Sequence, residues 1–175
     1  MNIDNFENSK AAEINKGTCW AVACCSIHTY YSGKKINPDS IKTMLGIAKT
    51  DRGGKKTGWA LGELGLKRVK LAIDKIGRDD FITKVDNEFK GNHPIVLTLQ
   101  DTKSKIKHAV VLYSIEKNDV VKIKQFDYLG CTLGEIAFSG DSKIMTNLTS
   151  KQEWELTGMF ATQAASTKVH EPSEA

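Results

Sequence analysis

Residues 17–31 read GTCWAVACCSIHTYY, and this segment is the strongest structural signal in the chain. Its apolar side chains recur three and four residues apart, which places them on one stripe of an α-helix. Thr18 is a suitable N-cap for that helix, and Gly33 is a suitable stop. We expect a helix over residues 19–31 that lies at the centre of the fold, because few polar residues occupy its other face.

The rest of the chain divides into a helical part and a strand-like part. Asn37-Pro38 is typical of a helix start, and glycines follow the later helical patterns. After His93 the apolar period becomes that of strands. Helices followed by an antiparallel sheet predict an α+β fold. The expected helices cover residues 38–48, 59–64 and 81–89, and the expected strands cover residues 69–73, 94–99, 106–115, 120–126, 135–138 and 154–162.

The length of 175 residues is that of one domain. We expect a single domain over residues 1–163. Its helical half covers about residues 10–91, and its β half covers about residues 92–163. Residues 164–175 are small and polar, so we expect a disordered tail there.

The composition excludes several classes of protein. Hydrophobic residues make up 40% and charged residues 26%, which is typical of a soluble globular protein rather than a disordered or fibrous one. No apolar run is long enough for a membrane span. The start lacks the pattern of a cleaved secretory signal, so we expect a cytoplasmic protein or one secreted without such a peptide. The net charge of +4 is small, and the basic strands lack interleaved aromatic residues, so we expect no nucleic-acid partner.

The four cysteines are read as thiols, because no pair has the spacing of a disulfide framework or a zinc site. We therefore expect no metal and no cofactor. Cys19 differs from the others by its position in the first turn of the expected central helix. Backbone N–H groups and the helix dipole favour a thiolate there. The alternative is a small buried side chain near a helix start.

His108 is the candidate proton acceptor for that thiol. It begins an apolar strand, so its ring can reach a cleft, although a solvated strand-end histidine would give the same pattern. Asp127 follows the next strand. In a hairpin of these two strands Asp127 would lie near His108 and could orient the imidazole. The alternative is an aspartate that caps a turn.

Three segments resemble the papain-like cysteine proteases. Gly17-Thr18-Cys19-Trp20-Ala21 resembles the cysteine segment of that family, and His108-Ala109-Val110-Val111 resembles its histidine strand. Phe126-Asp127-Tyr128-Leu129-Gly130 is similar to the acidic position of the compact bacterial branch, which includes bacteriocin-processing peptidase domains and secreted effector proteases. The resemblance spans about residues 10–162. It implies a papain-like fold, with a Cys-His-Asp triad in the cleft between the two halves.

The sequence departs from the family at the oxyanion position. The family carries a glutamine six residues before the cysteine, where this chain has Glu13. An ionised carboxylate accepts hydrogen bonds and repels an oxyanion. Asn15 could supply the amide instead, Glu13 could be protonated, or the enzyme could be weak or inactive.

Three further residues are candidates for the substrate cleft. Gly17 would let a substrate backbone come close, and Trp20 would pack beside the catalytic pair. Trp59 could line a pocket, although core packing of its short helix is the alternative.

The resemblance favours a cysteine peptidase that acts on protein or peptide substrates, in the setting of a bacterial effector or toxin. An acyl transferase of the transglutaminase kind would use the same triad. A non-catalytic binding module is the third possibility, favoured by Glu13. The oligomeric state is left open.

Overall fold

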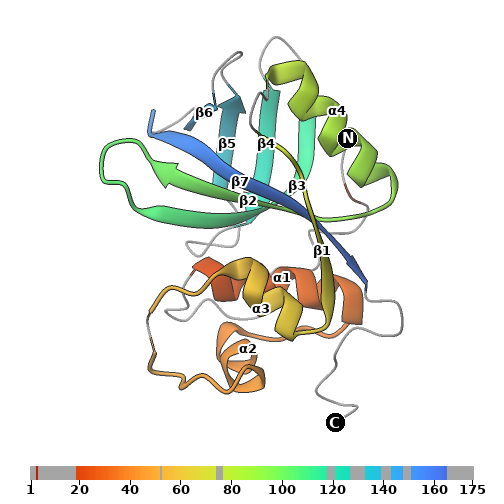
Figure 1. Ribbon diagram of the computed structural model, residues 1–175, viewed down its shortest axis with the longest axis vertical. Coiled ribbons are helices and arrows are strands. Elements are labelled where there is room, and N and C mark those ends of the chain that lie inside the picture. The colour runs from red at the N-terminus through yellow and green to blue at the C-terminus, as the bar shows by residue number, and fades with distance from the viewer. Residues whose placement is uncertain are drawn as a thin grey trace.

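A helical layer and a curved β-sheet make up the computed structural model (Figure 1). The structure describes residue 3 and residues 19–51, 53–73, 77–117, 121–126, 133–138, 143–147 and 151–164. This arrangement confirms the predicted α+β class. Within the described residues, the helices are all too short or too polar to cross a membrane.

The helix α1 (Cys19–Ser32) is central, as its pattern predicts. Every residue from Trp20 to Thr29 is buried. Gly33, with φ of 76°, ends the helix in the left-handed region, and its N–H donates to the Thr29 carbonyl at 2.8 Å. A thiol therefore stands at the first residue of a helix that is enclosed for most of its length.

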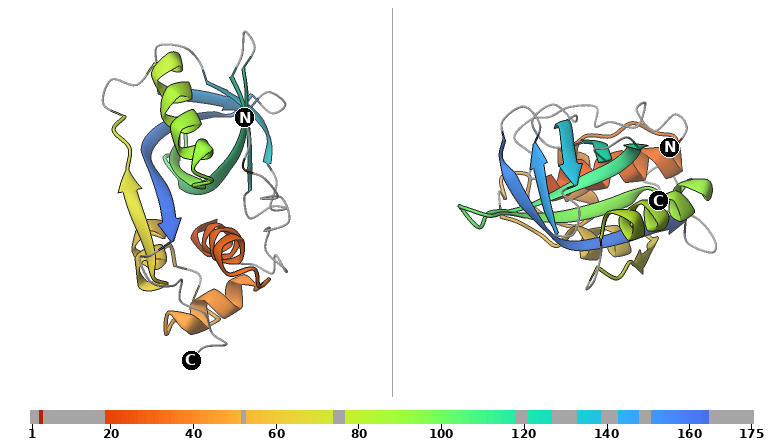
Figure 2. Two further views of the ribbon diagram at one scale, coloured as in Figure 1. Left: turned by 90° about the vertical axis from the view of Figure 1, so that its right-hand side faces the viewer. Right: turned by 90° about the horizontal axis from the view of Figure 1, so that it is seen from above.

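Two short helices pack against α1. In α2 (Pro38–Met44) the Asn37 side chain caps the helix by accepting from the Ser40 N–H at 2.8 Å, which confirms the predicted start. In α3 (Thr57–Glu63) the buried residues follow a helical stripe, and Gly65 with φ of 86° follows the helix. Figure 2 shows the three helices together on one side of the sheet.

The described strands form one antiparallel sheet that closes on itself. The order is β1-β7-β2-β3-β4-β5-β6, and β6 also pairs with β7. Because β7 pairs with both β2 and β6, strands β2 to β7 close into a barrel. Strand β1 pairs with β7 outside this barrel. The strands are β1 (Leu66–Lys70), β2 (Ile95–Asp101), β3 (Lys107–Lys117), β4 (Val121–Phe126), β5 (Leu133–Phe138), β6 (Ile144–Asn147) and β7 (Glu153–Ala164).

The core lies where α1 meets the sheet. Trp20 and Ile27 on α1 and Leu97 on β2 are at most 1% exposed, and α1 packs against β3. Each such burial stabilises the fold by about 1.5–3 kcal/mol. This packing sets α1 against the strand that carries His108.

The structure differs from the sequence expectation in two strands. The strand expected over residues 69–73 is β1, which begins three residues earlier and ends at Lys70, because its register with β7 runs from Leu66 to Lys70. The strand β6 was not expected, since its four residues are too few to give a readable alternation.

The expected boundary near residue 92 divides the sequence, but it does not separate the two layers in space. Strand β1 precedes residue 92 but belongs to the sheet. Helix α4 (Arg78–Lys90) also precedes it, yet the left view of Figure 2 places this helix beside the barrel, away from α1 and α2. At the other end, β7 continues through Ala164, and the rest of the expected tail lies outside the described residues.

Candidate active site

The structure brings Cys19 and His108 together. Cys19 is the first residue of α1, and His108 is the second residue of β3, the strand on which α1 packs. Their side chains are hydrogen-bonded to each other. Two residues that lie far apart in the chain therefore form a thiol–imidazole pair.

Burial raises the pKa of the Cys19 thiol, but the hydrogen bond and charge of His108 and the backbone N–H groups of Ala109 and Trp20 outweigh it. The result is a pKa below the ordinary value of 9.0. By contrast, burial strongly raises the pKa of Cys24 on the same helix. Because the thiolate is the nucleophilic form, the lowered pKa favours that form at Cys19, and the raised pKa disfavours it at Cys24.

His108 is 8% exposed, and its imidazole stacks on the indole of Trp154. The ring centroids are 5.5 Å apart, and the ring planes are inclined by 29°. The sequence analysis places Trp154 in a strand but gives it no role at the site. Only the position of β2 between β3 and β7 brings the two rings together, and no local pattern in the sequence indicates that order.

Asp127 lies outside the described residues, as do Glu13, Asn15 and Gly17. The expected hairpin of β3 and β4 is present, and its last pair joins Val111 to Phe126. Phe126, the residue before Asp127, is therefore paired with a β3 residue that lies three positions after His108.

The two tryptophans proposed for the cleft differ in exposure. Trp20 is 1% exposed, and its Nε1 donates to the Gly53 carbonyl at 3.3 Å, so it holds the loop before α3. Trp59 is 42% exposed, so the alternative of core packing is wrong for this residue. The buried stripe of α3 consists of Thr57, Ala60 and Leu61, and Trp59 projects from another face.

The described residues contain no cluster of three or more His, Cys, Asp or Glu side chains that could hold a metal. Within the same part of the chain, Cys19, Cys24 and Cys25 form no disulfide. The chemistry that this arrangement supports is nucleophilic attack by sulfur, with imidazole as the proton carrier.

The family model described as papain-like cysteine protease AvrRpt2 matches residues 5–127, a range that includes Cys19, His108 and Asp127. No curated protein matches the chain.

Proposed function

Because this chain belongs to the papain-like cysteine protease family of AvrRpt2, we propose that Cys19, His108 and Asp127 form its catalytic triad. The hydrogen bond between the Cys19 thiol and the His108 imidazole carries the proposal, together with the lowered pKa of Cys19. Asp127 would orient His108 and stabilise its charged form.

In the proposed reaction the Cys19 thiolate attacks the carbonyl carbon of a peptide bond. Protonated His108 then gives its proton to the departing amine, and the acyl group stays on sulfur. Water loses a proton to His108 and attacks the thioester, which releases the acid and restores the thiol. The cycle needs only water as co-reactant.

The oxyanion of each tetrahedral intermediate needs hydrogen-bond donors. We propose the backbone N–H of Cys19 and the side-chain amide of Asn15. Glu13 fits this role poorly when ionised, because a carboxylate has no hydrogen to donate. Gly17 and the exposed Trp59 are proposed to border the substrate.

Cleavage-site profiling tests the peptidase. A cell extract is incubated with the protein, and new protein N-termini are identified by mass spectrometry. We expect new termini with the wild-type chain and none with Cys19→Ala or His108→Ala. Cys24→Ala is the matched control, since it removes a thiol with a raised pKa from the same helix. New termini produced equally by Cys19→Ala would overturn the proposed nucleophile.

The same experiment addresses the acyl-transfer alternative. Adding a primary amine supplies a competing acceptor, and isopeptide products would identify a transferase. A folded protein that gives neither new termini nor amine products would support the binding module that Glu13 suggests.

We further propose that the protein acts as a bacterial effector, either in the cytoplasm or after export without a cleaved signal peptide. The resemblance to secreted effector proteases supports this setting. Fractionation of producing cells and their medium tests it, with recovery of the full-length chain from the medium as the expected result.

A further inference from the structure

The indole of Trp154 covers one face of the His108 imidazole. We propose that Trp154 is a positioning residue for the reaction, which holds the ring of His108 against Cys19 and stabilises its protonated form. This inference rests on the proposed roles of Cys19 and His108.

The register of the sheet explains how two distant residues meet. His108 on β3 pairs with Leu99 on β2, and Leu99 pairs with Leu156 on β7. Trp154 lies two residues before Leu156, so its side chain projects from the same face of the sheet. A register shift between Thr98 and Leu99 precedes these pairs. The indole therefore reaches His108 diagonally across β2.

The start of β7 is held by a carboxylate rather than left loose. One oxygen of Asp101 accepts from Gln152 Nε2 at 2.6 Å, and the other accepts from the N–H groups of Lys103 and Ser104 at 2.7 and 2.8 Å. The Thr102 N–H also donates to the carbonyl of Glu153 at 3.2 Å.

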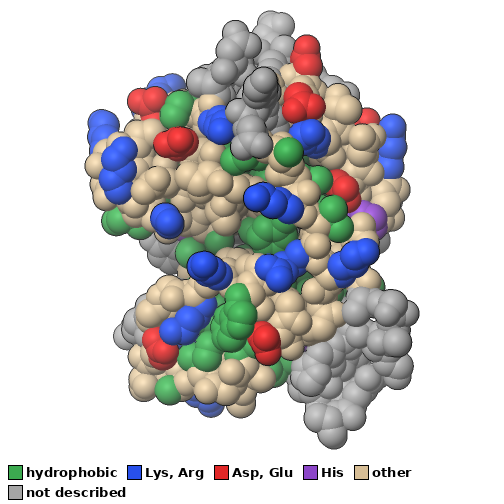
Figure 3. Space-filling view, viewed as in Figure 1, with side chains coloured by type: hydrophobic (Ala, Val, Ile, Leu, Met, Phe, Trp, Pro, Cys, Tyr) green, Lys and Arg blue, Asp and Glu red, His purple; other side chains and the backbone are tan. Residues whose placement is uncertain are grey.

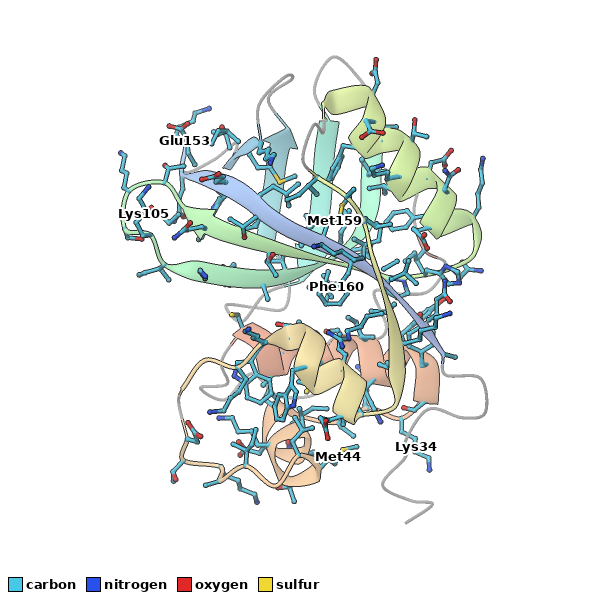
Figure 4. All side chains as sticks on the ribbon, in the orientation of Figure 1. Lys34, Met44, Lys105, Glu153, Met159 and Phe160 are labelled. Carbon is cyan, nitrogen blue, oxygen red and sulfur yellow. The ribbon has the colours of Figure 1, made fainter. Side chains whose placement is uncertain are left out.

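These bonds join the turn that leads into His108 to the segment that leads into Trp154. Figure 4 shows the labelled Lys105 and Glu153 at the same edge of the sheet, where this turn meets the start of β7. Both rings therefore project from strands that hydrogen bonds hold together at this edge of the sheet. A positioning residue needs such a fixed support.

The face of an indole carries negative potential, and it attracts a cation whose centre lies within about 6 Å of the ring. The imidazolium of His108 meets this condition, whereas neutral imidazole gains less. Trp154 therefore favours the state in which His108 holds the proton and Cys19 is a thiolate. The Cys19 thiol is hydrogen-bonded to the ring, and the carboxylate of Asp101 is engaged by Gln152 and the turn.

The test measures how fast iodoacetamide alkylates Cys19 as a function of pH, by mass spectrometry of the Cys19 peptide from the full chain. In Trp154→Leu we expect the midpoint of the rise in rate to move upward by about 0.5–1.5 pH units, from the usual strength of a cation–π contact. Phe160→Leu is the matched control on the same strand, because Phe160 pairs with Val96 and Lys70. Its midpoint should equal that of the wild type.

A second variant separates electrostatics from packing. Trifluorotryptophan incorporated at position 154 alone keeps the shape of the indole but weakens its negative face, so the midpoint should again move upward. This variant decides the question if Trp154→Leu does not fold. An unmoved midpoint in the fluorinated protein would overturn the inference, since a purely structural role is preserved there.

Failure of the proposed function gives a different result. If the wild-type Cys19 is alkylated only near the pH of an ordinary thiol, and His108→Ala changes nothing, the catalytic pair itself is wrong. If the wild type reacts at low pH and only the Trp154 variants fail to shift it, the pair stands and the role of Trp154 falls.

Discussion

Lys42 is a fully buried lysine whose partners are backbone carbonyls. Its side chain is 0% exposed, and Nζ donates to the carbonyl of Asp51 at 2.7 Å and to that of Lys49 at 3.5 Å. These carbonyls belong to the loop that Trp20 holds through Gly53. The buried side chains of Lys42 and Trp20 therefore anchor this loop, and Trp20 is the residue that follows Cys19.

Lys42→Met should lower the free energy of unfolding by about 1–3 kcal/mol, because it removes the two hydrogen bonds that hold the loop carbonyls of Lys49 and Asp51. Urea denaturation measures the change. Lys90→Met is the control, since that side chain is 72% exposed and its ion pair with Asp86 contributes little. Equal stability of the two variants would show that Lys42 has no anchoring role.

At the scale of elements, α3 and β1 fit together around Arg68. Figure 3 shows Lys and Arg side chains gathered where the two layers meet. Gly58 and Gly62 are four residues apart on α3, and the Arg68 side chain lies over both. A Cβ at Gly58 would stand 2.8 Å from Arg68 Nη1, while a Cβ at Gly62 would stand 3.6 Å from Nη2. Only the first position requires Arg68 to move.

Alanine favours a helix over glycine by up to about 1 kcal/mol. We expect Gly62→Ala to give a similar gain in the wild type and in an Arg68→Ala background. Gly58→Ala should give its gain only in the Arg68→Ala background, as measured by urea denaturation of the double-mutant cycle. A gain from Gly58→Ala that does not depend on Arg68 would contradict the close fit.

Asp101 connects two elements, the β2–β3 turn and the start of β7. Its hydrogen bonds to Gln152 and to the N–H groups of Ser104 and Lys103 lower the pKa of its carboxyl from 3.8 to about 2. A lowered pKa in the folded state means that the ionised group stabilises the fold above about pH 4. That stabilisation is lost as the pH falls toward 2.

Asp101→Ala should therefore lower Tm by a few degrees at pH 7 and make little difference near pH 2. Thermal unfolding followed by circular dichroism at both pH values measures the effect. A Tm difference that is the same at pH 2 as at pH 7 would mean that the carboxylate charge is not the cause.

The elements that the sequence predicts are those with long periods and clear caps. α1 is predicted by its stripe and by Gly33, and α2 is predicted by Asn37. β6 has too few residues for a period, and the bounds of β1 depend on its partner β7 rather than on its own residues. Pairing between distant strands is therefore the part that local sequence lacks.

The same limit applies to the site. Cys19 and His108 are predicted from their positions at the start of a helix and of a strand. Trp154 is not predicted, because its role depends on β2 lying between β3 and β7. Trp59 shows a smaller version of the problem, since its exposure depends on which face of α3 meets α1.

At the scale of the whole molecule, β7 completes the sheet. It pairs with β1, β2 and β6, and it buries Leu156, Met159 and Ala161. The matched family range ends at residue 127, before β5, β6 and β7. The part of the chain beyond that range is therefore needed for the part within it.

A chain of residues 1–127 should lack a cooperative unfolding transition, whereas a chain of residues 1–164 should keep the Tm of the full protein. Thermal unfolding by circular dichroism compares the two. Cooperative unfolding of the shorter chain would mean that the sheet forms without its closing strand.

The first helix and the last strand are joined near both ends. At one end Cys19 contacts His108, which stacks on Trp154 of β7. At the other end the Tyr31 hydroxyl donates to the Thr162 carbonyl of β7 at 2.6 Å. These two contacts lie about 20 Å apart along α1, so α1 and β7 resist rocking against each other, because rotation about either contact would strain the other. Entry of a polypeptide and release of its fragments must then come from movements of side chains and loops beside the site, without rocking of α1 against β7.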